Sequence, residues 1–75
     1  MKFGEALECL KDNFKVARHG WNGKNMWLTL VQGNGSTYMD YECTSFIAMK
    51  TADDKIVPWL ASQTDILAED WVPVS

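Results

Sequence analysis

The sequence predicts one α+β domain over residues 1–75, with an N-terminal helix, an antiparallel sheet of about four or five strands and a short second helix. Three observations predict this class. An apolar stripe at helical spacing begins the chain. Short apolar segments separated by turn residues make up its middle, and a helix-start pattern precedes the final extended segment. A chain of 75 residues has room for one domain at most.

The first helix is predicted from the spacing of apolar residues. Offsets of 0, 3, 4, 7 and 11 place five of them on one helix face: Phe3, Ala6, Leu7, Leu10 and Phe14. The charged residues between them fall on the opposite, solvated face. We expect the helix to end at Asp12 and Asn13.

Two strands and a hairpin are predicted next. Residues 15–18 are expected to form a short strand, residues 19–24 a loop, and residues 26–32 a longer strand whose two faces are both largely apolar. The Asn34-Gly35 pair that follows is the strongest short hairpin signal. We therefore expect residues 37–42 to be the return strand of this hairpin.

The second half of the chain continues the sheet. Residues 45–50 are a further strand with two apolar faces, and a turn at 51–54 leads into a strand at 55–57, which Pro58 is expected to end.

The second helix is predicted from a capping pattern. Ser62 followed three residues later by Asp65 resembles a capping box, so we expect a short helix from there to residue 69. Residues 70–74 then form a closing extended segment. Trp59 and Trp71, which flank this helix, are expected to lie in the core.

The amount of apolar surface predicts an oligomer. Apolar residues make up 47% of the chain and include four Trp, three Phe and four Met, more than so small a core can hide. Small domains are otherwise stabilised by disulfides or metals. Cys9 and Cys43 are expected to be reduced, and the single His19 lacks any metal-ligand spacing. We expect no metal or cofactor, and a second subunit that covers the two-faced strands.

Charge and targeting signals limit the function classes. Seven basic and 10 acidic residues give a formal net charge of -3, which argues against a nucleic-acid partner. Residues 1–5 contain no apolar signal-peptide core, and no apolar run approaches about 18 residues. We therefore expect a cytoplasmic protein without a membrane-spanning segment.

The segment 18–24 is the first candidate binding motif. Trp21 offers a flat face for stacking on a base, Asn22 a paired donor and acceptor for a base edge, and Arg18 and Lys24 positive charge for phosphate. The alternative is that Trp21 fills the gap between helix and sheet while the charged residues are simply solvated.

The helix start at 62–65 is the second candidate motif. Free backbone N–H groups at a helix start favour an anion, whereas Asp65 suits the hydroxyl pair of a ribose. The alternative is simple helix capping.

Enzyme signals are weak, because neither cysteine has a protease-like spacing to His19 and the chain has no GxxxxGK motif. Pairs such as Asp65 with Glu69 or Asp70 arise by chance in any acidic chain.

Three segments carry a resemblance to a known family. They read FGEAL at 3–7, VARHGWNGK at 16–24, and MKTAD, IVPWLASQTD and AEDW within 49–71. These segments resemble a small family of phage and prophage proteins whose best-understood members are the second type of Thoeris anti-defence protein. Members of that family sequester the cyclic ADP-ribose-type signals that bacterial TIR enzymes make during infection.

The resemblance implies a homotetramer built from dimers, with the nucleotide held between protomers and not hydrolysed. Some relatives also hold cyclic oligonucleotides in a separate site. The chain departs from its relatives in three places. Asn25 and Asp54 stand where glycine is usual, and the segment between Gln32 and Thr44 is shorter than in many relatives.

The two motifs together supply seven candidate ligand-binding residues: Arg18, Trp21, Asn22, Lys24, Gln63, Thr64 and Asp65. The resemblance implicates the motifs, whereas the individual roles follow from side-chain chemistry.

Each of these roles is assigned to one part of the nucleotide. Trp21 would stack on the base, and Asn22 and Gln63 would hydrogen-bond the base or ribose. Thr64 and Asp65 would hold ribose hydroxyls.

Arg18 or Lys24 would offset the charge of the pyrophosphate. Two other functions stay open at this point. One is a nucleic-acid-binding or protein-interaction accessory module that uses the basic region 11–24, and the other is a nucleotide hydrolase.

Overall fold

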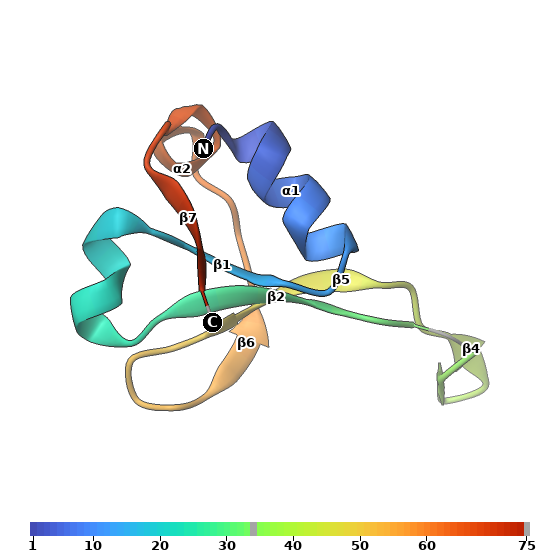
Figure 1. Cartoon of the computed structure of the whole chain (residues 1–75). Helices are drawn as coiled ribbons and strands as arrows, with labels where there is room; N and C mark the ends of the chain where they lie inside the picture. Colours follow the sequence, from blue (N-terminus) through green and yellow to red (C-terminus); the bar gives the residue numbers. More distant parts are fainter. Residues whose placement is uncertain (34, 75) are drawn as a thin grey trace.

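A computed structural model describes residues 1–33 and 35–74, except for the side chain of Asn22. The elements in chain order are α1 (Phe3–Lys11), β1 (Lys15–Arg18), η1 (His19–Lys24), β2 (Trp27–Val31), β3 (Thr37–Tyr38), β4 (Tyr41–Glu42), β5 (Phe46–Lys50), β6 (Ile56–Pro58), α2 (Gln63–Leu67) and β7 (Trp71–Val74). Figure 1 shows this α+β arrangement, which confirms the predicted fold class.

The main sheet has five strands in the order β6-β5-β2-β1-β7, and all neighbours are antiparallel. The first predicted strand therefore lies beside the last one, with Val16 opposite Pro73. Helix α1 packs over the β7, β1 and β2 end of the sheet (Figure 1). Two residues of β5, Ile47 and Met49, pack partly buried against the same core. None of the described helices is both long enough and apolar enough to cross a membrane.

Helix α1 begins and ends as its sequence predicts. The backbone N–H of Lys2 donates to the Glu5 carboxylate at 3.1 Å, which satisfies one donor at the helix start. Asp12 caps the end, and Asn13 takes a left-handed conformation with φ 67°. The prediction for Phe14 was wrong: it follows the turn, lies outside the helix and is 59% exposed. The turn ends the helical periodicity, so the buried stripe stops at Leu10.

The core lies between α1 and its end of the sheet. Five residues with no exposed surface form it: Ala6, Leu10, Val16, Leu28 and Trp71. Trp71 is the largest of them, and three aromatic rings surround it. The ring centroids of Phe3, Trp21 and Trp59 lie 5.4, 5.5 and 6.0 Å from that of Trp71. The core position predicted for Trp71 is confirmed, and Trp59 packs partly buried against it.

The predicted hairpin between residues 26–32 and 37–42 does not form. Strand β2 pairs instead with β5, with Leu28 opposite Met49. Residues 37–42 form a separate two-stranded sheet, β3 with β4, which projects from the body in Figure 1. We call residues 35–43 the β3–β4 arm. Asn34, on which the predicted Asn-Gly turn depends, lies outside the described residues.

The β3–β4 arm contains its own tight turn. Met39 and Asp40 both have positive φ, at 53° and 69°, which reverses the chain between two two-residue strands. Two hydrogen bonds close the base of the arm. The Gly33 N–H donates to the Ser45 hydroxyl at 3.0 Å, and the Cys43 N–H donates to the Ser36 carbonyl at 2.9 Å.

Three further boundaries differ from the predictions. Residues 19–24 form a 3-10 helix, not a loop, although they still connect β1 to β2. Pro58 is the last residue of β6; an edge strand tolerates proline because one side of it has no hydrogen-bonding neighbour. Helix α2 ends at Leu67, two residues earlier than predicted, with Ala68 already extended.

The two positions at which the family resemblance implies glycine share a backbone feature. Asn25 and Asp54 have φ of 55° and 66°, in the left-handed region that glycine adopts without steric cost. Asn and Asp are among the residues that tolerate this region best. The chain therefore keeps the turn shape at both positions without glycine.

Candidate functional site

Trp71 brings the two candidate motifs together. Its indole N–H donates to the backbone carbonyl of Asp65 at 2.9 Å, which ties the middle of α2 to the start of β7. The ring of Trp21 meets it edge-on at an interplanar angle of 80°, the arrangement that aromatic quadrupoles favour. The segment around η1 and the segment around α2 therefore meet at one buried aromatic side chain.

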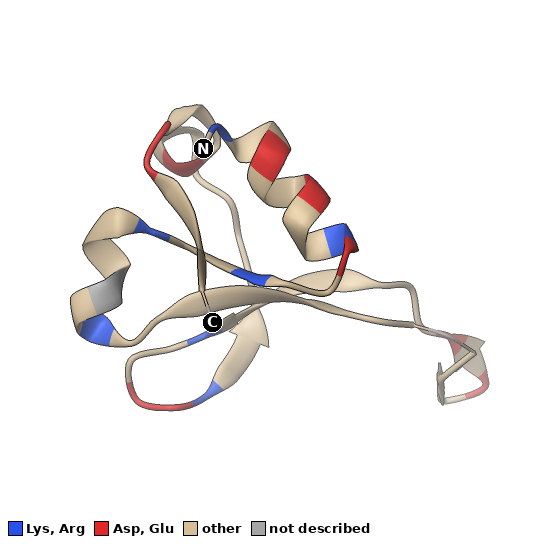
Figure 2. Ribbon diagram, in the orientation of Figure 1, with Lys and Arg blue, Asp and Glu red and all other residues tan. Residues whose placement is uncertain are grey.

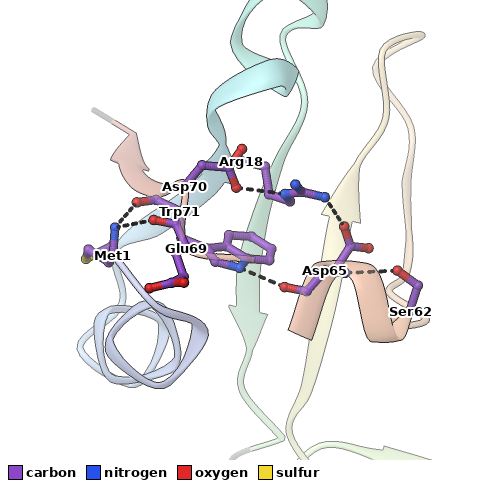
Figure 3. Close-up of polar contacts among 7 residues, drawn as sticks. All are labelled: Met1, Arg18, Ser62, Asp65, Glu69, Asp70 and Trp71. Atoms are coloured by element: carbon purple, nitrogen blue, oxygen red, sulfur yellow. Dashed lines mark hydrogen bonds and ion pairs between the residues drawn. The ribbon is translucent and has the colours of Figure 1, made fainter. Parts of the chain in front are cut away.

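Arg18 links the same two segments by charge. Its Nε donates to Oδ1 of Asp70 at 2.9 Å, and its Nη1 donates to Oδ1 of Asp65 at 3.0 Å (Figure 3). The side chains are 24% exposed for Arg18, 17% for Asp65 and 43% for Asp70. Figure 2 shows the basic end of β1 next to η1, and the acidic positions in α2 and in its connection to β7, which supply these groups.

These contacts shift two pKa values. The hydrogen bond from Arg18 lowers the pKa of Asp70 below its usual range, with a smaller opposing effect of burial. The hydrogen bonds to Asp70 and then Asp65 raise the pKa of Arg18. The Arg18–Asp70 pair is therefore fully charged at neutral pH.

The start of α2 is capped by its own serine. The Ser62 hydroxyl accepts the backbone N–H of Asp65 at 3.1 Å, and the Ser62 carbonyl accepts the N–H of Ile66 at 3.0 Å. The capping role predicted for Ser62 is confirmed. The Asp65 carboxylate does not complete the capping box, because it is turned toward Arg18.

The N-terminus holds the segment before β7 in place. The Met1 amino group donates to the Trp71 carbonyl at 2.7 Å, and the Trp71 N–H donates back to the Met1 carbonyl at 3.1 Å. A longer contact of 3.4 Å joins the same amino group to the Glu69 carbonyl. The His19 N–H donates to the Asp70 carbonyl at 3.0 Å. Backbone contacts thus fix residues 69–71 from two sides.

Three of the seven candidate residues lie in one neighbourhood: Arg18, Trp21 and Asp65 are connected through Trp71. Gln63 and Thr64 are exposed on the first turn of α2. Lys24 is exposed at the end of η1 and forms no salt bridge with a described residue.

The side chain of Asn22 lies outside the described part of the molecule, so its role stays a prediction. The described residues of a single chain enclose no pocket. They also contain no group of three His, Cys, Asp or Glu side chains placed to hold a metal ion.

Two residues of this neighbourhood were absent from the sequence-based set. The sequence predicts Trp71 only as a core residue, because no local pattern indicates a partner for its indole N–H. The sequence shows Asp70 as one of several carboxylates near Asp65. Such a pair does not indicate a binding site unless a cation is known to lie between the two carboxylates. Arg18 is that cation, and it lies 47 residues from Asp65 in the sequence.

Comparison with known proteins finds similarity over nearly the whole length of the chain. A family model described as the Thoeris anti-defense 2-like domain matches residues 1–74. A relative from Bacillus phage SP01, named Thoeris anti-defense 2, is 48% identical over 85 aligned residues, which include all of this chain and 96% of the relative. The alignment is longer than this chain, so the relative carries residues that the chain lacks.

Proposed function

The chain belongs to the Thoeris anti-defense 2-like family, and we propose from this premise that it binds and sequesters the cyclic ADP-ribose-type nucleotides made by bacterial TIR enzymes. A phage protein that holds this signal without cleaving it prevents activation of the Thoeris effector. It would act in the host cytoplasm, where the signal is made. Family membership is the observation that carries this proposal, and the chemistry around Trp71 supports it.

The neighbourhood of Trp71 offers the groups that such a nucleotide needs. Trp21 is partly buried against Trp71, so part of its ring remains available for stacking on a base. Asp65 presents a carboxylate that can accept ribose hydroxyls. Lys24 supplies an exposed positive charge at the other end of the same 3-10 helix, suited to a pyrophosphate.

Exposed apolar surface supports the proposal that several copies assemble. Ten large apolar side chains are at least 38% exposed: Phe14, Tyr38, Met39, Tyr41, Phe46, Ile56, Val57, Leu60, Ile66 and Leu67. Half of them fall within residues 56–67, which cover β6 and α2. Small monomers rarely expose so much apolar surface without a partner. We propose a homotetramer in which the nucleotide lies between protomers.

A binding protein fits these side chains better than an enzyme. Hydrolysis of a pyrophosphate or glycosidic bond needs a metal, a nucleophile or a matched acid and base. The two carboxylates in the candidate site both accept hydrogen bonds from Arg18, and Arg18 keeps Asp70 ionised, so Asp70 is a poor general acid. Sequestration needs only tight and slow-release binding in a site that excludes water.

The proposal is tested by identifying what the protein captures. The purified protein is incubated with extract from cells that carry an active TIR defence system, washed, and denatured by heat. We expect mass spectrometry of the released material to find an intact cyclic ADP-ribose-type nucleotide. Release of a cleaved nucleotide would instead show a hydrolase. Capture of long single strands with steep salt dependence would favour the nucleic-acid-binding module.

A further inference from the structure

The side chain of Arg18 joins three segments at the candidate site. It extends from β1, and its two carboxylate partners lie 47 and 52 residues further along the chain, in α2 and just before β7. The planar guanidinium presents its donors in a fixed fork. Once Nε is bound to Asp70, the direction of Nη1 toward Asp65 is determined (Figure 3).

The charge of this cluster is wrong for a phosphate. One guanidinium and two carboxylates give Arg18, Asp65 and Asp70 together a net charge of about -1. A phosphate bound to the remaining donors of Arg18 would lie close to both carboxylates and would be repelled by them. Hydroxyl groups, in contrast, donate hydrogen bonds to carboxylates and add no charge.

One oxygen of Asp65 remains open. Oδ1 accepts the hydrogen bond from Arg18, whereas Oδ2 accepts none from the described residues (Figure 3). An ionised carboxylate has about four acceptor positions, so Asp65 can hold Arg18 and a ligand hydroxyl at the same time. The orientation set by Arg18 decides where Oδ2 points.

We propose that Asp70 is a positioning residue: it holds the guanidinium of Arg18, and Arg18 in turn fixes Asp65 with Oδ2 directed at a ribose hydroxyl of the nucleotide. Arg18 then serves orientation rather than phosphate binding, and Lys24 is left as the candidate for the pyrophosphate. This inference rests on the proposed function for its ligand, although the positioning itself is a property of the free protein.

The test compares three substitutions in the full-length protein. Asp70→Asn keeps the size of the side chain but removes its charge, and Asp70→Glu restores the charge. Asp53→Asn is the matched control, because Asp53 is also an exposed carboxylate with a lowered pKa, paired with Lys55 in the distant turn before β6. An ion pair as exposed as that of Asp70 adds little to stability, so all three variants are expected to fold.

Two measurements are made on each variant. The first is hydrogen exchange of the Trp71 indole N–H without ligand, followed by NMR, because this N–H is bound to the Asp65 carbonyl and reports whether that residue is held. The second is the affinity for the nucleotide purified from the TIR-active extract. We expect Asp70→Asn to speed the exchange several-fold and to weaken binding about tenfold or more, as loss of a charge-assisted hydrogen bond does. Asp70→Glu should restore both, and Asp53→Asn should change neither.

The outcomes separate the two proposals. Unchanged exchange in Asp70→Asn would show that Asp70 does not hold Arg18 and Asp65, and would overturn the inference. Faster exchange with normal nucleotide binding would overturn it as well, because the orientation of Asp65 would then not matter for the site. Faster exchange in a protein whose unmodified form captures no nucleotide would support the positioning and reject the proposed function.

Discussion

Aromatic side chains in the main sheet and in the separate β3–β4 arm have opposite surroundings. Trp71 has no exposed surface, because α1, β1, η1 and α2 all converge on the start of β7. Tyr38 and Tyr41, in the β3–β4 arm, are 72% and 78% exposed. They lie opposite each other in the two-stranded sheet, and among the described strands β3 and β4 pair only with each other. The residue types are similar, so the difference lies in how many elements meet at each position.

The packed region around Trp71 and the β3–β4 arm therefore have different structural roles. The packed Trp71 end supplies the stability of a single chain and positions the candidate site. The β3–β4 arm adds little to that stability, since a two-stranded hairpin alone is marginal in water. Its exposed aromatic residues are better explained by contact with another molecule, and this agrees with the proposed tetramer.

The largest expected effect comes from removing the packed aromatic residue. Trp71→Ala should destabilise the chain by about 3–5 kcal/mol, because it leaves a cavity and breaks the contact with Asp65. Tyr41→Ala should change the stability of a single chain by less than about 0.5 kcal/mol. Urea unfolding of both variants at low protein concentration measures the difference. Similar losses would mean that the two regions do not differ as described.

Backbone packing at the base of the β3–β4 arm gives the next effect. A Cβ at Gly33 would collide with the carbonyl oxygen of Cys43 and approach the backbone of Thr44 and Ser45 within 3.0 Å. Gly33→Ala should therefore destabilise the protein by roughly 1–3 kcal/mol, as overpacking does. Gly20→Ala, where a Cβ meets nothing within 4 Å, is the control. Thermal unfolding compares them, and equal melting temperatures would show that the base can open without cost.

The candidate site itself is tested at Trp21, which lies on the border of the packed region. Trp21→Ala should weaken nucleotide binding by about 1–3 kcal/mol, or roughly 5- to 150-fold, through loss of the stacking face. Trp21→Phe keeps an aromatic ring and should retain part of the affinity. Calorimetric titration measures both variants. Normal binding by a folded Trp21→Ala protein would mean that this side chain only packs against Trp71.

A smaller effect is expected in acid. Arg18 lowers the pKa of Asp70 in the folded state, so this carboxylate stabilises the fold above its unfolded pKa of about 3.9 and the contribution is lost as pH falls through the folded pKa. Asp70→Asn removes that contribution at every pH. Melting temperatures from about pH 6 to about pH 2 should therefore fall less steeply for the variant than for the original protein. Parallel curves would argue that the ion pair does not form in solution.

Much of the packed region was predictable from the sequence because its signals are local. The stripe that starts at Phe3, the strand at 15–18 and the Ser62 cap each depend on neighbours within a few residues. The pairing of β1 with β7 was not predictable, since it joins the two ends of the chain. The hydrogen bonds from Arg18 to Asp65 and Asp70 were not predictable for the same reason, because these residues are far apart in the sequence.

The β3–β4 arm was predicted wrongly for a different reason. The Asn34-Gly35 pair favours a hairpin, but strand β2 has a longer and more apolar partner in β5. The turn that does form in the arm has Met39 in a left-handed conformation. Few non-glycine residues adopt this conformation, and no sequence pattern predicts it here. The local signal was therefore overruled by burial of the longer strands.

The central claim is that copies of this chain assemble and hold an intact nucleotide signal. Native mass spectrometry tests it most directly, on protein incubated with TIR-active extract and then freed of unbound material by buffer exchange. We expect a four-subunit species whose added mass equals a whole number of uncleaved cyclic ADP-ribose-type nucleotides. A monomer at micromolar concentration with no added mass would contradict both the assembly and the sequestration.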